Sequence, residues 1–426
     1  MNDMSTTAVQ DFVQDPTNPR NPHLPRFAGR DNIRAHVPAE LVIESGIITT
    51  PEFLAEPHDY MAAMHRNFPP VFYSPSDYGN SWTLIKHEDC LKVLRNANDF
   101  RNLDIAPFPR PDDDYFFFIP PEIDPPHHRK YRNIVDPLFC PAGIKTLEGK
   151  IRQRAIDLIE GIVADGECQF TTAFGRPLPV AVFLDIMGLP QDMMGTFVGW
   201  CDTMIHSQDQ AEIGAAFNKA IAYLKGAIAE KQANPDGGVV SLIANAEIDG
   251  RKLSEKEIFG FVCFLWIGGL DTVYATLNNI WVWLARNPER VQEIIDRPDD
   301  IDDIVEELLR RYSVTFSGRV VARDIELRGV KMRQGDRVLC CLPAANFDPD
   351  VFPNPLEVDF DRPRKTILAF TVGVHSCMGG HLARMEVKIA LQEWLKRIPK
   401  FGIEPGAEIK YKPGGVVGPA AVPLVW

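Results

Sequence analysis

The stretch AFTVGVHSCMGGHLARMEVKIAL, residues 369–391, places one cysteine, Cys377, among small and apolar residues directly before a helical pattern. Beyond the cysteine, apolar residues recur at helical spacing while charged residues fall between them. This arrangement predicts an amphipathic helix. The apolar positions are Ala383, Val387, Ala390, Leu391, Trp394 and Ile398.

Glycines flank this cysteine and open the predicted helix, where backbone N–H groups have no partner within the helix. Such N–H groups and the positive end of a helix stabilise a thiolate and lower its pKa. Gly373 and Gly379 also allow the backbone to approach a flat partner closely. With no second cysteine or histidine at metal-binding spacing, the thiolate suits one axial bond to a haem iron. For a lone cysteine, a buried structural thiol is the commoner case.

The full pattern FxxGxHxCxG at 370–379 resembles the haem-binding loop of the cytochrome P450 family, whose cysteine thiolate holds the haem iron. The resemblance implies haem b as the cofactor and Cys377 as the axial ligand of its iron. It assigns further haem contacts to Phe370, His375 and Gly379. One departure is Thr371, where the family most often has glycine.

A second helical pattern opens with a capping box, Ser254 with Glu257, and contains WIGGLDTVYATL at 266–277. Two glycines inside a helix cost roughly 1 kcal/mol each relative to alanine. The hydroxyl of Thr272 can bond the carbonyl of Gly268, four residues earlier, and open the helix. A groove with a hydroxyl and a carboxyl suits dioxygen binding and proton delivery. A helix kink with a satisfied polar pair explains the motif equally well.

The cytochrome P450 family carries an Ala/Gly-Gly-x-Asp/Glu-Thr motif at this place, and the sequence matches it. The resemblance implies that Thr272 supports the bound dioxygen and that Asp271 relays protons from solvent. Both residues are therefore the predicted catalytic pair.

Charged residues elsewhere match the family's supporting contacts. Glu307 and Arg310 stand at i and i+3 of a predicted helix, a spacing that alone more often marks a solvated surface pair. The resemblance implies instead a buried pair that Arg362 completes, fixing the segment that presents the cysteine. By the same resemblance, four residues are expected to bind the haem propionates: His128, Arg132, Arg319 and His375.

The motifs IDPP, EELLRRYS, GGLDT, HLAR and the ending PLVW are most similar to the bacterial camphor hydroxylase branch. There a tyrosine bonds the camphor ketone, whereas the matching residue here is Phe116, which has no hydroxyl. Tyr115 is adjacent, and a shifted alignment restores the hydroxyl. Positions that line the substrate pocket in relatives are Phe116, Phe264, Ile267, Gly268, Thr315 and Val416. Their mostly apolar character favours a small hydrophobic, terpenoid or norisoprenoid-like substrate.

Composition limits the other possibilities. The 426 residues have 45 basic and 58 acidic side chains, a formal net charge of −13, which argues against nucleic-acid and anionic-membrane partners. The start of the chain has no signal-peptide pattern, and the longest apolar run, 258–270, is too short to cross a bilayer. Eight cysteines without framework spacing favour a reducing cytoplasm. We therefore expect a cytoplasmic protein without a membrane anchor.

Residues 1–40 are rich in proline and asparagine and predict an extended arm, and 41–426 are expected to form one catalytic domain. Its helical patterns with short β-rich pieces predict a mainly α fold with small sheets, the cytochrome P450 fold that the resemblance implies.

No flavin or NAD motif is present, so the electrons must come from other proteins. The resemblance implies a [2Fe–2S] ferredoxin and a flavin ferredoxin reductase. HHRKYR (127–132) with Arg384 and Lys388 is a candidate basic dock for the ferredoxin, although ordinary surface charge explains it as well. Two alternatives remain at this point. A peroxide-driven peroxygenase usually lacks the acid–alcohol pair, and a haem-based sensor or carrier needs no proton relay.

Overall fold

A computed structural model of the protein describes residues 30–76, 79–102, 116–207 and 209–426. As predicted, it is rich in helices and has only small sheets. The α-helices are α2 (Pro51–Ala55), α3 (Pro57–Asn67), α4 (His87–Arg95), α5 (His128–Phe139), α6 (Pro141–Lys145), α7 (Glu148–Glu160), α8 (Pro177–Met187), α9 (Met194–His206), α10 (Gln210–Ala233), α11 (Val239–Ala244), α12 (Glu255–Leu270), α13 (Thr272–Arg286), α14 (Pro288–Asp296), α15 (Ile301–Arg311), α16 (Leu342–Asn346) and α17 (Gly380–Arg397).

Short helices and strands complete the fold. The short helices are η1 (Ala39–Leu41), η2 (Val163–Asp165), η3 (Thr171–Gly175), η4 (Gln191–Met193) and η5 (Pro298–Asp300). The strands are β1 (Val71–Ser74), β2 (Ser81–Leu84), β3 (Phe100–Arg101), β4 (Glu167–Gln169), β5 (Glu247–Ile248), β6 (Arg251–Lys252), β7 (Ser317–Val321), β8 (Ile325–Leu327), β9 (Val330–Met332), β10 (Arg337–Cys340), β11 (Gly402–Ile403) and β12 (Pro423–Val425). Of the predicted arm, residues 1–29 lie outside the described part.

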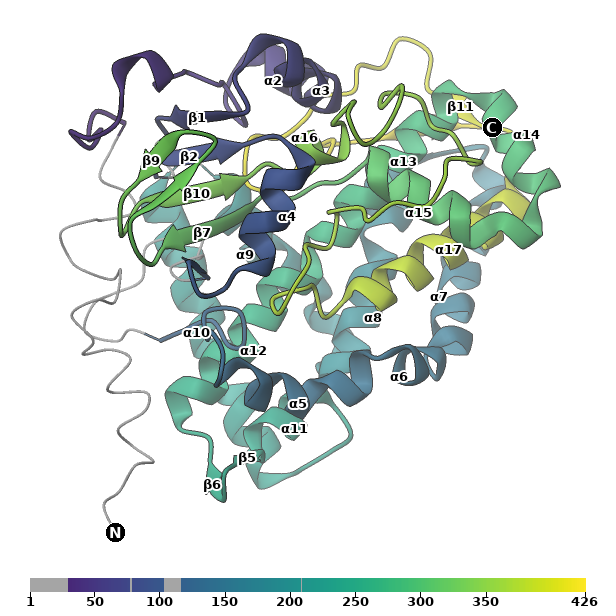
Figure 1. Ribbon diagram of the computed structural model, residues 1–426. Coiled ribbons are helices and arrows are strands. Elements are labelled where there is room, and N and C mark those ends of the chain that lie inside the picture. The colour runs from purple at the N-terminus through teal and green to yellow at the C-terminus, as the bar shows by residue number, and fades with distance from the viewer. Residues whose placement is uncertain (1–29, 77–78, 103–115, 208) are drawn as a thin grey trace.

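The largest sheet has the strand order β1-β2-β10-β7-β3, in which β10 pairs parallel with β2 and the other pairs are antiparallel. It lies on one side of the molecule, at the upper left of Figure 1, and the helices fill the rest. Because β7 carries Arg319, this sheet places one of the predicted propionate ligands.

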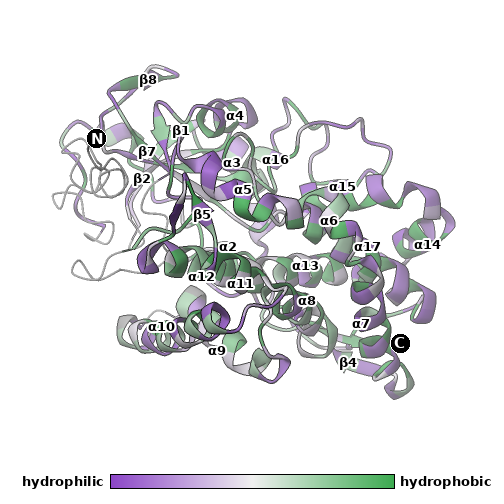
Figure 2. Ribbon diagram, turned by 90° about the horizontal axis from the view of Figure 1, so that it is seen from below, coloured by the Kyte–Doolittle hydropathy of each residue, from purple (hydrophilic) through white to green (hydrophobic). Residues whose placement is uncertain are grey.

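Helices α12 and α13 run through the middle of the molecule and are largely hydrophobic (Figure 2). Together, Glu255–Arg286 are long and apolar enough to cross a membrane, but 67% of their most apolar window is buried inside the protein, as in a core helix. The predicted capping box of Ser254 and Glu257 is present at the start of α12. The predicted break is confirmed, because α12 ends at Leu270 and α13 begins at Thr272.

Helix α17 confirms the first sequence prediction. It begins at Gly380, three residues after the cysteine, and all six predicted apolar positions are buried. The chain that precedes it crosses the face of the molecule between α4, α5 and α17 (Figure 1). The cysteine thus lies just before the N-terminus of a helix whose apolar face is packed in the core.

Candidate active site

A cavity of about 690 Å³ separates the cysteine loop from the break between α12 and α13. Cys377, Phe370 and Gly379 line it from the loop, and Gly268 and Thr272 line it from the break. Its volume is within the range of cavities that enclose a cofactor or ligand, roughly 300–1,000 Å³. The cysteine motif and the glycine–aspartate–threonine motif therefore face one cavity.

The loop around the cysteine is shaped by two residues with left-handed backbone angles. Gly373 has φ +81°, and a Cβ there would lie 2.7 Å from the carbonyl oxygen of Leu94, so only glycine fits against α4. Thr371 has φ +54°, a backbone conformation that favours glycine, the residue that the resemblance leads us to expect at this position. Its hydroxyl donates to the carbonyl of His375 at 3.0 Å.

Cys377 itself is exposed, because it lines the cavity. Protein atoms nevertheless surround its sulfur, and burial raises the pKa of the Cys377 thiol, although N–H groups at the start of α17 and two nearby arginines act in the opposite direction. The predicted lowering of this pKa is therefore wrong for the free thiol, because burial outweighs the helix end. A metal cation that takes the proton's place deprotonates a coordinating thiol outright.

The predicted propionate ligands lie together along the cavity wall. His128, Arg132, Arg319 and His375 all line it. The Nη2 atom of Arg319 and the Nδ1 atom of His375 are buried without a hydrogen-bond partner among the described residues. A buried cationic donor without a partner is costly, so the wall fits a ligand that carries carboxylates, as haem does. Arg132 also donates to the carbonyl of Ser376 at 2.8 Å, which ties α5 to the cysteine loop.

The two histidines in this wall are close to each other. The rings of His128 and His375 meet edge to face with centroids 4.7 Å apart. Burial, with the neighbouring His375, lowers the pKa of His128 to about 4. Burial also lowers the pKa of His375, although its Nε2 atom lies 2.8 Å from Oδ1 of Asp124. A carboxylate ligand beside these rings would favour their charged forms.

The break between α12 and α13 has the predicted hydrogen bond. The hydroxyl of Thr272 donates to the carbonyl of Gly268 at 3.1 Å. A Cβ on Gly268 would meet only the ring of Phe264, at 3.9 Å, whereas a Cβ on Gly269 would lie 2.4 Å from the ring of Phe183. Gly269 thus permits close packing on α8, while Gly268 leaves space on the cavity side.

Asp271 lies behind Thr272 in a buried polar network and does not line the cavity. Its Oδ2 atom lies 3.3 Å from Nε2 of His206, and its carboxylate also accepts a hydrogen bond from Tyr274. Burial is the main cause that raises the pKa of Tyr274 well above its usual value, and the negative charge of Asp271 adds to the effect. The network continues from Tyr274 to Arg176, whose guanidinium carbon lies 4.5 Å from the centre of the tyrosine ring.

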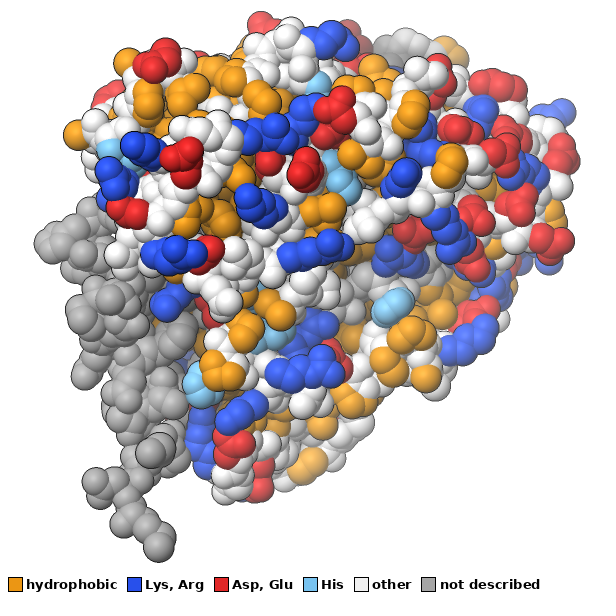
Figure 3. Space-filling model, in the orientation of Figure 1, with side chains coloured by type: hydrophobic (Ala, Val, Ile, Leu, Met, Phe, Trp, Pro, Cys, Tyr) orange, Lys and Arg blue, Asp and Glu red, His pale blue; other side chains and the backbone are white. Residues whose placement is uncertain are grey.

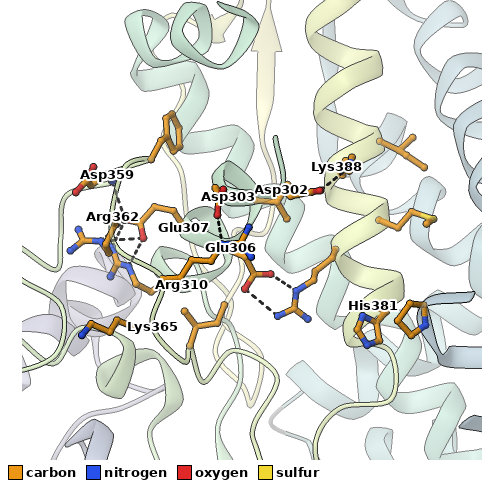
Figure 4. A pocket seen from close by; sticks show the side chains of 18 of the residues that line it. Asp302, Asp303, Glu306, Glu307, Arg310, Asp359, Arg362, Lys365, His381 and Lys388 are labelled. Atoms are coloured by element: carbon orange, nitrogen blue, oxygen red, sulfur yellow. Dashed lines mark hydrogen bonds and ion pairs between the residues drawn. The ribbon is translucent and has the colours of Figure 1, made fainter. Parts of the chain in front are cut away.

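Glu307, Arg310 and Arg362 form one buried cluster (Figure 4). Arg310 donates twice to Glu307, at 2.8 Å each, and Nε of Arg362 lies 3.1 and 3.2 Å from the same two oxygens. Arg310 also donates to the carbonyls of Asn346 and Pro355. The structure thus brings the three predicted residues together, where they tie α15 to the chain that leads toward the cysteine.

The predicted substrate positions divide into two groups. Phe264, Ile267, Gly268, Thr315 and Val416 line the cavity, and a β-bridge joins Thr315 with Val416. Phe116 does not line it. Its ring packs behind α12, 4.8 Å from the ring of Phe259 and 6.2 Å from that of Phe217. Tyr115, the alternative position, lies outside the described residues.

Two contacts near the site were not predicted. No motif around His206 indicates a role for it, and only the approach of α9 to the helix break reveals its contact with Asp271.

The carboxylate of Glu257 accepts one hydrogen bond from Tyr131, at 2.5 Å, and two from Arg251, at 2.8 Å each. The capping box predicts that Glu257 caps the start of α12, but the hydrogen bond that links Glu257 to Tyr131 of α5 depends on the tertiary fold.

Comparisons with known proteins agree with this geometry. The family model for cytochrome P450 matches residues 301–412. The chain is 34% identical over 399 residues to the probable cytochrome P450 127A1 of Sinorhizobium fredii, with 92% of this chain and 96% of that protein covered. It is 30% identical over 370 residues to the mycinamicin IV hydroxylase/epoxidase of Micromonospora griseorubida, with 84% and 92% covered.

Solved structures give the same result. The structure of CYP101J2 matches with a TM-score of 0.80 and 30% identity, and that of CYP101C1 with a TM-score of 0.82 and 29% identity. Each comparison covers 92% of this chain and 99% of the other. These matches support the resemblance to the camphor hydroxylase branch.

A cysteine that faces a cavity, opposite a helix break with a hydroxyl and a carboxylate, defines a haem-thiolate monooxygenase. The chain belongs to the cytochrome P450 family, and its cofactor is haem b.

When bound, haem supplies dioxygen activation, and a thiolate ligand favours cleavage of the O–O bond. The chain supplies the surroundings of that chemistry. Cys377 offers the sulfur, and Arg319 offers an unpaired donor to a propionate. Thr272 places a hydroxyl at the cavity, with the Asp271 carboxyl buried behind it. The apolar part of the wall excludes water and orients a hydrophobic molecule.

Proposed function

We propose that this monooxygenase hydroxylates a small hydrophobic substrate of the terpenoid or norisoprenoid type. The reaction is R–H + O2 + two electrons + two protons giving R–OH + water. The observation that carries the proposal is the apolar wall beside Thr272, to which Phe264, Ile267 and Val416 contribute. Because the same cavity takes the haem, only part of its volume is left for the substrate. This favours a small molecule.

Thr315 is one of the polar residues that line the cavity together with this apolar wall. Its hydroxyl can donate to a ketone oxygen of the substrate. Phe116 cannot do so, since it has no hydroxyl and packs behind α12. A norisoprenoid ketone held by Thr315 therefore fits this chain better than camphor held at position 116.

Titration of the ferric protein with α-ionone tests the substrate class, because a substrate that displaces water from the iron changes the absorption spectrum. We expect a saturable change with α-ionone and weaker binding of camphor. Thr315→Val should weaken binding of the ketone about two- to tenfold, the loss of one hydrogen bond. It should leave binding of the matching hydrocarbon without the ketone unchanged. No spectral response to any terpenoid or ionone would contradict the proposal.

The proposed electron donors are a [2Fe–2S] ferredoxin and a flavin ferredoxin reductase, in the cytoplasm. Several cations of the expected dock have acidic partners: Lys130 pairs with Asp249, Arg384 with Glu306 and Lys388 with Asp302. Basic and acidic side chains are interspersed over the right-hand part of the face in Figure 3, where α14, α15 and α17 lie.

Arg129, in contrast, is 77% exposed and lies 3.7 Å from its nearest acidic partner, Asp136. It is therefore the cation on the cysteine side that we assign to ferredoxin docking. Arg129→Glu should slow reduction by the ferredoxin and weaken the salt dependence of that rate. Lys410→Glu is the matched control, because Lys410 is 78% exposed and also 3.7 Å from its partner. Equal rates for both variants and the unchanged protein would exclude this dock.

The buried acid behind Thr272 favours dioxygen over peroxide as the oxidant, since a peroxide-driven enzyme needs no supply of protons to the bound oxygen. Product formation with hydrogen peroxide alone, exceeding that with NADH and the redox proteins, would favour the peroxygenase alternative. Absence of product under both conditions, with haem bound, would favour a sensor or carrier.

A further inference from the structure

One oxygen of the Asp271 carboxylate depends on a single polar neighbour. Oδ2 of Asp271 lies 3.3 Å from Nε2 of His206, and neither atom has another hydrogen-bond partner among the described residues. The two side chains are 3% and 9% exposed, so bulk water does not solvate the pair. An unsolvated carboxylate oxygen needs a donor, and His206 is the group in position to supply it.

The second ring nitrogen of His206 determines which atom carries the shared proton. Nδ1 lies 2.8 Å from the carbonyl oxygen of Pro413. Because a carbonyl only accepts, Nδ1 carries a hydrogen in both forms of the ring. Nε2 then presents a lone pair in the neutral ring and a proton in the imidazolium. A lone pair facing an ionised carboxylate is unfavourable, so one proton must lie between Nε2 and Oδ2.

The groups around His206 favour this proton. Burial alone lowers the pKa of His206, but Asp271, the Pro413 carbonyl and Asp202 together raise it above the usual value. The other described titratable or charged groups that face this region are Cys201 on α9, Arg176 before α8, Tyr274 on α13 and Lys412 in the C-terminal segment. Arg176 and Lys412 both pair with Asp202, so they partly cancel its charge.

We propose that His206 is the residue that supplies protons to Asp271 during turnover. The Nε2–H bond of the imidazolium breaks and an O–H bond forms at Oδ2 of Asp271. The ring is left neutral with its hydrogen on Nδ1, and Asp271 becomes a neutral acid beside Thr272. A proton from solvent then returns to Nε2 and restores the imidazolium; because Nε2 is itself buried, this return requires the pair to open briefly toward water, on the side of His206, which is 9% exposed against 3% for Asp271. This step deepens the monooxygenase activity and does not depend on which substrate is bound.

A purely structural His206 would only tie α9 to the C-terminal segment through Pro413. His206→Asn separates the two roles, because its amide keeps a donor toward Pro413 but has no proton to give to Asp271. His65→Asn is the matched control. His65 is also a half-buried histidine with a ring nitrogen 2.7 Å from a backbone carbonyl, that of Ala344, but among the described residues it forms no ion pair with a carboxylate.

The direct test is an NMR pH titration of the His206 ring in the diamagnetic reduced carbon monoxide complex of the holoprotein. We expect a pKa above that of a free histidine, which falls by roughly one unit or more in Asp271→Asn. The same pKa in both proteins would overturn the proposal, since no proton would then be shared. This readout needs neither substrate nor ferredoxin, so its failure is distinct from a failure of the proposed substrate class.

A second test measures product and hydrogen peroxide formed per NADH between pH 6 and pH 9, with α-ionone as the substrate. In the unchanged protein the yield of product should fall as the pH rises through the pKa of His206. His206→Asn should give about tenfold less product per NADH at low pH, with little dependence on pH. His65→Asn should behave like the unchanged protein. A His206→Asn protein with normal yield and a normal pH profile would overturn the proposal.

Discussion

The hydroxyl of Thr272 donates to the carbonyl of Gly268 at 3.1 Å, across the point where α12 ends and α13 begins. This contact keeps a hydroxyl at the cavity wall, with the carboxyl of Asp271 buried directly behind it. The helix gives up regular hydrogen bonding here. Gly268 has no side chain to fill the opening, and Gly269 allows the helix to pack closely on Phe183. The break between α12 and α13 is thus the feature that places these polar groups at the site.

Replacement of Thr272 by valine keeps the branched shape and removes the hydroxyl. We expect severalfold less product per NADH and correspondingly more hydrogen peroxide, while Thr272→Ser retains most of the yield. The reason is that a positioned hydroxyl contributes to proton transfer. Thr276→Val is the control, because Thr276 also lines the cavity and its hydroxyl also donates to a carbonyl four residues earlier, that of Thr272 at 2.9 Å, but it lies one helical turn away from Asp271. Normal yield in Thr272→Val would exclude this role.

Replacement of Glu307 by glutamine should destabilise the fold strongly. The carboxylate is buried and holds two arginines, so its neutralisation leaves their charges without a partner. We expect a loss of about 3 kcal/mol or more in the free energy of unfolding, together with poor haem retention. Asp303→Asn, on the same helix, removes an exposed ion pair with Arg364 and should cost less than about 1 kcal/mol. Similar losses in both variants would contradict the cluster's role.

The left-handed backbone of Thr371 predicts that replacement by valine destabilises the fold more than replacement by glycine. Thr371→Val keeps the strained backbone and loses the hydrogen bond to the His375 carbonyl, so it should destabilise by about 1 kcal/mol. Thr371→Gly loses the same bond but relieves strain of about 1–2 kcal/mol. Thermal unfolding of the holoprotein should therefore show a lower midpoint for valine than for glycine. The reverse order would show that the strain is not significant.

The pKa of the Glu257 carboxyl predicts how the free energy of unfolding changes at acidic pH. Burial raises the pKa of Glu257, but hydrogen bonds from Arg251 and Tyr131 outweigh it and lower the pKa to about 2. A lowered carboxyl pKa stabilises the fold fully above its unfolded value of 4.5, and this contribution is lost as the pH falls toward 2. The shift corresponds to about 3 kcal/mol.

Urea unfolding at pH 6 and pH 3.5 measures this effect. The unchanged protein should lose more stability between these pH values than Glu257→Gln, which lacks the titrating group. Glu148→Gln is a control at a more exposed ion-paired glutamate, and its pH dependence should stay close to normal. An identical pH dependence for Glu257→Gln and the unchanged protein would contradict the assignment.

Patterns within short stretches of the sequence were sufficient to predict much of the site. Helix α17 has an apolar face at regular spacing, the glycines mark the break before Thr272, and Glu307 with Arg310 are neighbours on one turn. These features depend on residues a few positions apart, whose geometry is fixed by the helix itself.

Features that depend on distant segments were missed. His206 meets Asp271 only because α9 folds over the helix break, and no periodicity in the sequence indicates that approach. Phe116 was expected in the pocket, but its ring is held by Phe217 and Phe259 from two other helices. The pKa of Cys377 was judged from the helix end alone, whereas burial by the whole fold decides its direction.

The central claim is that the sulfur of Cys377 binds the haem iron. The absorption spectrum of the reduced protein with carbon monoxide tests it most directly. We expect the long-wavelength band of a thiolate-ligated haem in the unchanged protein and in Cys140→Ala, a partly exposed cysteine that does not line the cavity. Cys377→Ala should lose that band. The long-wavelength band persisting in Cys377→Ala, or its absence from the unchanged haem-loaded protein, would contradict the account.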